Sequence, residues 1–272
     1  MNAPMHLAEP SLRPAAVAGR FYPGEPAALR AELDALLAAA PALAGPRPCA
    51  LIVPHAGYVY SGPVAASAYK QIAAMDPPPR RIILLGPAHT VGLRGVALPA
   101  ATAFATPLGA LRIDPELANL AAASPLVLRS AEAHAREHAL EVQLPFIQHV
   151  LGDLPILPLV IGQVAPVALA DLLDRLWHPG TLVLVSTDLS HYLSHAEAHA
   201  RDAATVRQIL ALDDSIEPDQ ACGAFALRGF LHLARRRHLV PRLLDLRSSG
   251  DTAGDRRRVV GYAALAFAEA DA

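Results

Sequence analysis

Lysine is nearly absent from this chain of 272 residues, in which Lys70 is the single example. The 23 lysine and arginine residues are slightly outnumbered by 25 acidic residues, and the formal net charge at pH 7 is −2. A charge this close to zero gives no overall positive field that would attract a nucleic acid or an anionic membrane. We therefore expect neither a nucleic-acid partner nor a membrane partner.

Cysteine and long apolar runs are also scarce. The two cysteines, Cys49 and Cys222, are too few for a disulfide framework and suit a reducing compartment. The longest uncharged apolar stretch, residues 154–170, is interrupted by prolines and is shorter than the ~20 residues that a membrane-spanning helix needs. The start of the sequence contains no apolar segment of the kind found in secretory signals. These absences predict a cytoplasmic protein.

Several sequence motifs with well-understood chemistry are missing as well. Neither C-x-x-C nor H-E-x-x-H occurs, so a metal site would have to be assembled from segments that are distant in the sequence. The phosphate-binding motifs G-x-G-x-x-G and G-x-x-x-x-G-K-[ST] are absent, and so is G-x-S-x-G. These absences argue against a dinucleotide cofactor, phosphate cradling and ordinary serine hydrolysis.

Apolar residues, in contrast, are abundant: 53% of the chain is hydrophobic and 18% is charged, which supports a large buried core. No linker or internal repeat marks a boundary, so a single domain is the simplest interpretation. Short apolar runs alternate with segments of helical spacing, which predicts an α/β domain. Strands are expected at residues 50–54, 81–86, 156–161, 181–186, 240–247 and 259–266, and helices at residues 25–40, 64–72, 137–150, 167–177, 196–212 and 222–236.

Three of the predicted strands end in loops that carry histidine. His55 lies in P-H-A-G-Y, His89 in G-P-A-H-T, and Asp188 and His191 in S-T-D-L-S-H. Any one of these histidines alone is equally well explained as a hydrogen-bonded loop residue. Their recurrence at strand ends, where open α/β sheets bind ligands, favours a functional cluster. Neutral imidazoles from separate strands, with a carboxylate or thiolate nearby, are typical ligands of a mononuclear iron, copper or zinc site.

Two further groups of polar residues have two interpretations each. In R-E-H-A-L-E-V-Q-L-P, the residues Glu137, His138 and Glu141 suit either a group that orients ligands or substrate, or a surface ion-pair patch. The helical spacing puts His138 and Glu141 on one face. Asp188 lies three residues before His191. It either orients His191 as a general acid or base, or caps a helix while His191 is exposed.

The two cysteines are also open to more than one interpretation. Cys222 lies in Q-A-C-G-A-F near a predicted helix start, where the helix dipole favours a thiolate. Taken without other information, Cys222 is better interpreted as a small buried apolar residue, and the same applies to Cys49.

Seven motifs occur in order between about Ala18 and Phe267: A-G-R-F-Y-P-G, V-P-H-A-G-Y-V-Y-S-G, G-P-A-H-T, F-A-T-P-L-G-A-L-R-I-D, E-H-A-L-E-V-Q-L-P-F, S-T-D-L-S-H and A-C-G. Together they resemble the Memo family, whose bacterial members are called AmmeMemoRadiSam system protein B. This resemblance implies an α/β fold like that of the class III extradiol dioxygenases, which are non-haem iron enzymes. It implies a tail over residues 1–17 and one domain over residues 18–268, with a central mixed sheet flanked by helices on both faces.

The resemblance also implies a site and a metal. Fe(II) is the metal it favours, and copper or zinc are the alternatives. The implied metal ligands are His55, His89 and Cys222, where the cysteine replaces a glutamate of the dioxygenases. The implied catalytic residues are His191 and Asp188, and the implied residues of the substrate pocket are His138 and Glu141.

Three functions remain open at this stage. The first is a metal-dependent redox enzyme, an oxygenase or oxidase, with His191 moving protons. The second is a non-catalytic protein that binds a small molecule or a peptide in the same pocket and associates with a radical-SAM protein and an AMMECR-type protein, as the family name suggests. The third, weaker possibility is a zinc hydrolase with Glu141 as its base.

Overall fold

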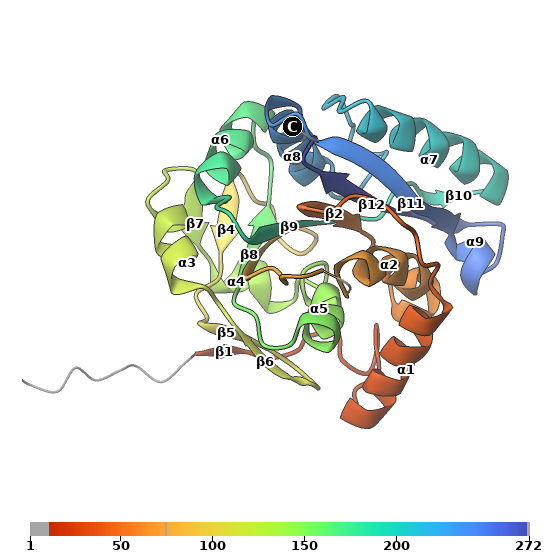
Figure 1. The fold of residues 1–272 in the computed structure, drawn as a ribbon, viewed down its shortest axis with the longest axis horizontal. Helices are drawn as coiled ribbons and strands as arrows, with labels where there is room; N and C mark the ends of the chain where they lie inside the picture. Colours follow the sequence, from red (N-terminus) through yellow and green to blue (C-terminus); the bar gives the residue numbers. More distant parts are fainter. Residues whose placement is uncertain (1–10, 74, 271–272) are drawn as a thin grey trace, which may run out of the picture.

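A single mixed β-sheet of nine strands forms the centre of the computed structural model, which describes residues 11–73 and 75–270 (Figure 1). Four neighbouring strands in the middle run parallel, namely β2 (Ala50–Val53), β9 (Thr181–Ser186), β3 (Arg81–Pro87) and β8 (Ile156–Ile161). Antiparallel strands flank this group, since β12 (Val259–Ala268) pairs with β2, and β4 (Val96–Leu98) pairs with β8. The outer strands are β10 (His191–Leu193), β11 (Val240–Ser248) and β7 (Val127–Arg129). The predicted mixed sheet is confirmed.

The central strands are apolar because both of their faces are buried. Along β2, Ala50 and Ile52 contribute to one hydrophobic core, whereas Leu51 and Val53 contribute to the core on the opposite face. This alternation follows from the two-residue period of a strand. A strand whose two faces are both buried is apolar at every position, and this continuous apolar run is the pattern from which the strand was predicted.

Helices cover both faces of the sheet, as expected (Figure 1). One face is packed by helices that include α1 (Pro26–Ala39), α2 (Tyr58–Ala73) and α5 (Leu144–Leu151). The other face is packed by α3 (Pro115–Ala122), α6 (Pro166–Leu176), α7 (His195–Leu210) and α8 (Ala224–Arg236). Two short helices, α4 (Ala131–Ala135) and α9 (Ser249–Thr252), complete the α-helices of the described residues. Within the described ranges, no helix combines the length and apolar character needed to cross a bilayer.

The N-terminal segment differs from the expected tail. The strand β1 (Leu12–Arg13) pairs with β5 (Ala103–Thr106), which in turn pairs with β6 (Gly109–Arg112), in a separate three-stranded sheet. Arg13 is buried because its guanidinium group has partners inside the domain. Residues 11–17 are therefore part of the folded unit, while residues 1–10 lie outside the described residues.

The helix predicted over residues 137–150 is shorter than expected. The backbone is irregular through residues 137–140, a 3-10 turn follows at Glu141–Gln143, and α5 begins at Leu144. Pro145 favours a helix start at this place because its missing N–H costs nothing in the first turn. This irregular segment carries residues of the predicted site, so its conformation matters below.

Candidate metal centre

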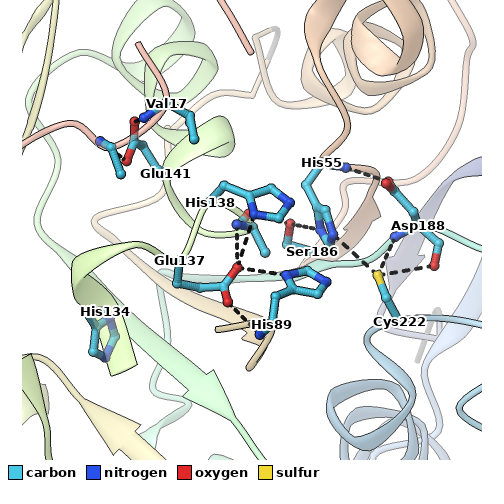
Figure 2. A network of polar contacts seen from close by, with 12 residues as sticks. Val17, His55, His89, His134, Glu137, His138, Glu141, Ser186, Asp188 and Cys222 are labelled. Atoms are coloured by element: carbon cyan, nitrogen blue, oxygen red, sulfur yellow. Dashed lines mark hydrogen bonds and ion pairs between the residues drawn. The ribbon is translucent and has the colours of Figure 1, made fainter. Parts of the chain in front are cut away.

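The predicted strand-end residues meet at one edge of the sheet. His55, His89 and Asp188 each lie two residues beyond the last residue of β2, β3 and β9, respectively. Because these three strands run parallel and side by side, their carboxyl ends lie together. Cys222 reaches the same place from the loop before α8, as Figure 2 shows.

Two histidines and the cysteine form a group that is able to hold a metal ion. One ligand atom from each of His55, His89 and Cys222 lies within 4.8 Å of the other two, and Cys222 Sγ is 3.3 Å from His55 Nε2. Ligands bound to one metal at ~2.0–2.3 Å lie roughly 3–4 Å from each other. The donor set of two imidazoles and one sulfur therefore fits a transition metal such as iron, copper or zinc without large rearrangement.

His55 lies at the buried end of this group. The ring nitrogen Nδ1 lies 3.0 Å from Ser186 Oγ, and the backbone N–H donates to Asp188 Oδ1 at 2.7 Å. Burial, together with the nearby charge of His89, lowers the pKa of His55 to about 3. His55 is therefore a neutral imidazole at physiological pH, which is the form that binds metals.

His89 lies at the open end and is held by a buried carboxylate. Its backbone N–H donates to Glu137 Oε2 at 2.7 Å, and its Nδ1 lies 2.9 Å from Glu137 Oε1. Burial opposes ionisation of Glu137, but the hydrogen bonds from His89 and from the Ala139 N–H outweigh it and lower the pKa of Glu137 to about 2. An ionised carboxylate accepts only, so Nδ1 of His89 carries a proton and its Nε2 is free for a metal.

His138 packs beside the candidate ligands. Its ring is stacked on His89 at a centroid distance of 4.7 Å and meets the ring of His55 edge-on at 5.4 Å. Phe21 covers another side of the ring at 4.8 Å. Burial and the neighbouring His55 lower the pKa of His138 to about 4. His138 therefore forms an uncharged wall of the site.

Cys222 is half-buried, and two polar groups lie near its sulfur. The Asp188 N–H points to it at 3.3 Å, and Thr187 Oγ1 is 3.7 Å away. A Cβ at position 223 would lie 2.7 Å from the Thr187 side chain, so glycine after the cysteine permits this approach. Burial and the charge of Asp188 raise the pKa of Cys222 to about 12, which outweighs the helix dipole on which the thiolate expectation rested.

Asp188 and His191 do not form the expected hydrogen-bonded pair within the described structure. Asp188 is buried and accepts from the His55 backbone, whereas His191 is exposed at the start of β10. Burial raises the pKa of Asp188, and the hydrogen bond from the His55 backbone and the charge of His191 act in the opposite direction. His191 therefore lies within electrostatic range of the site without being oriented by Asp188.

Glu141 does not line the pocket, which corrects the prediction. Its carboxylate accepts hydrogen bonds from Tyr22 Oη at 2.6 Å and from the N–H groups of Ala16 and Val17 at 2.7 and 2.9 Å, and it forms an ion pair with Arg13. Figure 2 shows Glu141 directed away from the histidines. The irregular backbone between residues 137 and 140 removes the shared helical face that the spacing assumed. Glu141 is therefore a structural anchor.

Sequence reasoning missed two residues that support the site, namely Gln143 and Ser186, and it named Glu137 only as one of the residues able to orient ligands or substrate. Glu137 lies in the same motif as His138, but spacing alone gives no indication that it binds His89. Ser186 is the last residue of β9 and the first residue of S-T-D-L-S-H, and this position at a strand end is the signal that pointed to it.

A cavity of about 300 Å³ adjoins Cys222. It is bounded by the loop after β3, the end of β8 and the first turn of α8, with side chains such as Val91, Ile161 and Phe225. The lining residues are uncharged, so the cavity suits a neutral apolar group next to the candidate metal ligands.

These features define an α/β protein with a candidate two-histidine, one-cysteine metal site at the carboxyl edge of its sheet. The model of the family described as "Memo-like protein" matches residues 13–266, and the chain therefore belongs to the Memo-like family.

Relatives named as MEMO1 family proteins come from several organisms. A MEMO1 family protein of Metallosphaera sedula is 36% identical over 233 residues, which cover 80% of this chain and 82% of the relative. Another from Methanopyrus kandleri is 36% identical over 287 residues, covering 94% and 98%, and one from Aquifex aeolicus is 33% identical over 272 residues, covering 94% and 99%. Among solved structures, an uncharacterized protein from Escherichia coli K12 has a TM-score of 0.49 at 14% identity, covering 79% of this chain and 98% of that one.

Proposed function

We propose that this protein is a metal-dependent redox protein that binds non-haem Fe(II) through His55, His89 and Cys222. Copper is the alternative metal that a thiolate ligand favours, and zinc also fits the donor set. The observation that carries the proposal is the approach of three ligand atoms from three separate segments to within 4.8 Å of one another. Bound Fe(II) would supply one-electron and oxygen chemistry, with open coordination positions for a substrate.

The chain's own residues would prepare this chemistry. Glu137 holds His89 by two hydrogen bonds, and Cys222 is surrounded by the N–H of Asp188 and the hydroxyl of Thr187. His138 and Phe21 shield one side from water. The exposed His191 would exchange protons between solvent and the site, in the role of a general acid and base.

The adjoining cavity supports a small or partly apolar substrate. Its volume of about 300 Å³ is at the lower limit of ligand pockets, and no charged side chain lines it. An oxygenase or oxidase reaction on a neutral organic group is the activity that this combination favours.

A second candidate function is the binding of a peptide or partner protein, for which exposed apolar residues provide support. Val59 and Tyr60 follow His55 closely, Tyr192 follows His191, and these side chains are 60%, 42% and 64% exposed. The radical-SAM and AMMECR-type proteins suggested by the family name are the partners we propose to test.

The zinc hydrolase is not retained, because Glu141 is fully buried and its carboxylate is bound by Arg13, Tyr22 and two backbone N–H groups. Glu141 is therefore not free to act as a base.

Metal content tests the proposed function. The protein is reconstituted anaerobically with Fe(II), desalted and analysed by mass spectrometry, alongside His55→Ala, His89→Ala and Cys222→Ser. We expect about one iron in the wild type and a strong loss in each variant, whereas His149→Ala, a histidine paired with Asp34 on the surface, retains iron. Folding is checked by circular dichroism. Equal iron content in all folded variants would remove the proposed site, and binding of the partners to metal-free protein would then favour the second function.

A further inference from the structure

A chain of buried hydrogen bonds leads from α2 to the ring of His55. Tyr69 Oη donates to Gln143 Oε1 at 2.8 Å, Gln143 Nε2 donates to Ser186 Oγ at 2.8 Å, and Ser186 Oγ lies 3.0 Å from His55 Nδ1. All four side chains are at most 1% exposed. Bulk water therefore does not compete for these groups, and the direction of each hydrogen bond is set by the protein itself.

The amide of Gln143 has one orientation that satisfies its neighbours. Its Nε2 lies 2.9 Å from the backbone carbonyl of Pro54, which accepts only. The exchanged orientation would set two carbonyl oxygens against each other. Gln143 therefore uses one amide proton on Pro54 and the other on Ser186, while its Oε1 accepts from Tyr69.

The hydroxyl of Ser186 is then fully assigned. It has one proton and two lone pairs, and the proton is donated to the carbonyl of Ala139 at 2.7 Å. One lone pair accepts from Gln143 Nε2. The remaining lone pair faces His55 Nδ1, so the proton in that hydrogen bond has to come from the imidazole.

We propose that Gln143 and Ser186 are positioning residues that fix His55 in the tautomer with its proton on Nδ1. The other nitrogen, Nε2, is the one that faces Cys222 Sγ at 3.3 Å, and it keeps its lone pair. The use of this lone pair for a metal rests on the proposed function. The tautomer itself is a property of the metal-free chain and is testable separately.

The two histidines of the site are thereby prepared by different means. His89 donates its Nδ1 proton to the anionic Glu137, whereas His55 donates to a neutral hydroxyl oriented by a neutral amide. A carboxylate partner raises the basicity of the imidazole that it holds. The anionic Glu137 thus holds the exposed ligand, His89. The neutral Ser186 holds the buried His55 and adds no second buried charge beside Asp188.

The tautomer is measured in the metal-free protein by nitrogen NMR of labelled histidine. After chelator treatment, long-range proton–nitrogen spectra at pH 7.5 assign each ring nitrogen as protonated or unprotonated, and His55→Gln identifies the His55 signals. We expect a protonated Nδ1 and an unprotonated Nε2. A protonated Nε2 in the wild type would overturn the proposal. This conclusion depends on the wild-type spectrum alone, whether or not the variants of Ser186 fold.

The role of Ser186 is tested by Ser186→Ala, with Ser67→Ala as the matched control. Ser67 is also fully buried and its hydroxyl also donates one hydrogen bond, but to Asp245. In folded Ser186→Ala we expect the two His55 nitrogens to show mixed protonation, while Ser67→Ala keeps the wild-type spectrum. An unchanged His55 spectrum in Ser186→Ala would show that Ser186 does not fix the tautomer.

A Co(II) titration separates this proposal from the proposed function. Loss of an outer hydrogen-bond partner typically weakens metal binding 10- to 100-fold, and we expect Co(II) affinity to fall by about this factor in Ser186→Ala. If the wild type shows the Nδ1–H tautomer and binds no Co(II), the positioning role stands and the metal function fails. If Ser186→Ala has mixed tautomers but unchanged Co(II) affinity, the positioning role of Ser186 is supported, and the expected effect of the tautomer on metal binding is contradicted.

Discussion

At the scale of single residues, burial decides which protonation state each group of the site adopts. It lowers the pKa of His55 to about 3 and that of His138 to about 4, and it raises the pKa of Cys222 to about 12. Without a metal, the rings of His55 and His138 are consequently neutral, and so is the thiol of Cys222. The sole strongly acidic group in direct contact with a candidate ligand side chain in the described structure is Glu137.

Binding of a metal should therefore release the proton of Cys222. Because the thiol is protonated in the metal-free protein, the apparent Co(II) affinity should rise about tenfold for each pH unit between pH 7 and 8.5. Cys49→Ala, which lies at the opposite end of the sheet, should keep this slope. The measurement is a Co(II) titration across pH, and an affinity independent of pH would mean that Cys222 does not bind as a thiolate.

Replacement of Glu137 by glutamine should weaken metal binding without unfolding the protein. The amide keeps the shape of the carboxylate, but it loses the charge that holds the Nδ1 proton of His89, and its NH2 group cannot accept an N–H as the carboxylate oxygens do. We therefore expect a 10- to 100-fold lower Co(II) affinity. Glu132→Gln, an exposed position in α4, serves as the control and should bind as the wild type does. Equal affinities of the two variants would contradict the role of Glu137.

His134 should make the protein sensitive to acid. Its Nε2–H donates to the Ala97 carbonyl at 2.9 Å, and burial lowers its pKa to about 4. The unfolded chain, with a histidine pKa of about 6.5, takes up this proton first, so stability is lost as the pH falls from about 6.5 to 4.

The variant His134→Gln keeps a donor for Ala97 and removes the titrating ring. Between pH 7.5 and 5, wild-type stability should fall by ~2 kcal/mol more than that of the variant, as measured by urea denaturation of metal-free protein. A difference that stays constant over this pH range would show that His134 is not held in its neutral form.

At the scale of elements, the N-terminal strand holds the irregular segment that carries Glu137 and His138. The guanidinium of Arg13 donates to the carbonyl of His134 at 3.0 Å, to the carbonyl of Glu137 at 2.7 Å and to the carboxylate of Glu141. A segment without regular hydrogen bonding needs such partners for its backbone carbonyls. Residues 11–17 therefore contribute to the geometry of the site although they do not reach it.

Removal of this buried ion pair should be costly. Arg13→Met leaves the carboxylate of Glu141 buried without its cation, and we expect a loss of ~3–5 kcal/mol in the free energy of unfolding. Arg112→Met, which breaks a pair with Asp153 whose side chains are 71% and 64% exposed, should change stability by less than ~1 kcal/mol. Urea denaturation of both variants checks this, and equal losses would contradict the assigned role of Arg13.

At the scale of the whole molecule, the sheet explains how much of the site was predictable. Parallel buried strands were evident from their apolar runs, and a parallel arrangement brings His55, His89 and Asp188 together without further information. Cys222 comes from a loop before a helix, and its place in the site followed from the family resemblance alone. The structure confirms its proximity to His55.

The carboxylates show what a sequence pattern cannot resolve. Glu137 and Glu141 are four residues apart, yet the first holds His89 and the second holds Arg13. The directions of the two side chains depend on the irregular backbone before α5 and on the N-terminal strand β1, which carries Arg13. Such contacts are tertiary, so neither spacing nor residue type distinguishes the two roles.

The central claim is that His55, His89 and Cys222 bind one metal ion together. X-ray absorption of the Co(II)-loaded protein tests it most directly, because sulfur and nitrogen ligands differ in distance. We predict one sulfur at about 2.3 Å and two imidazole nitrogens at about 2.0–2.1 Å, with the sulfur signal lost in Cys222→Ser. A coordination shell without sulfur in the wild type, or one that keeps its imidazoles in His55→Ala/His89→Ala, would contradict the claim.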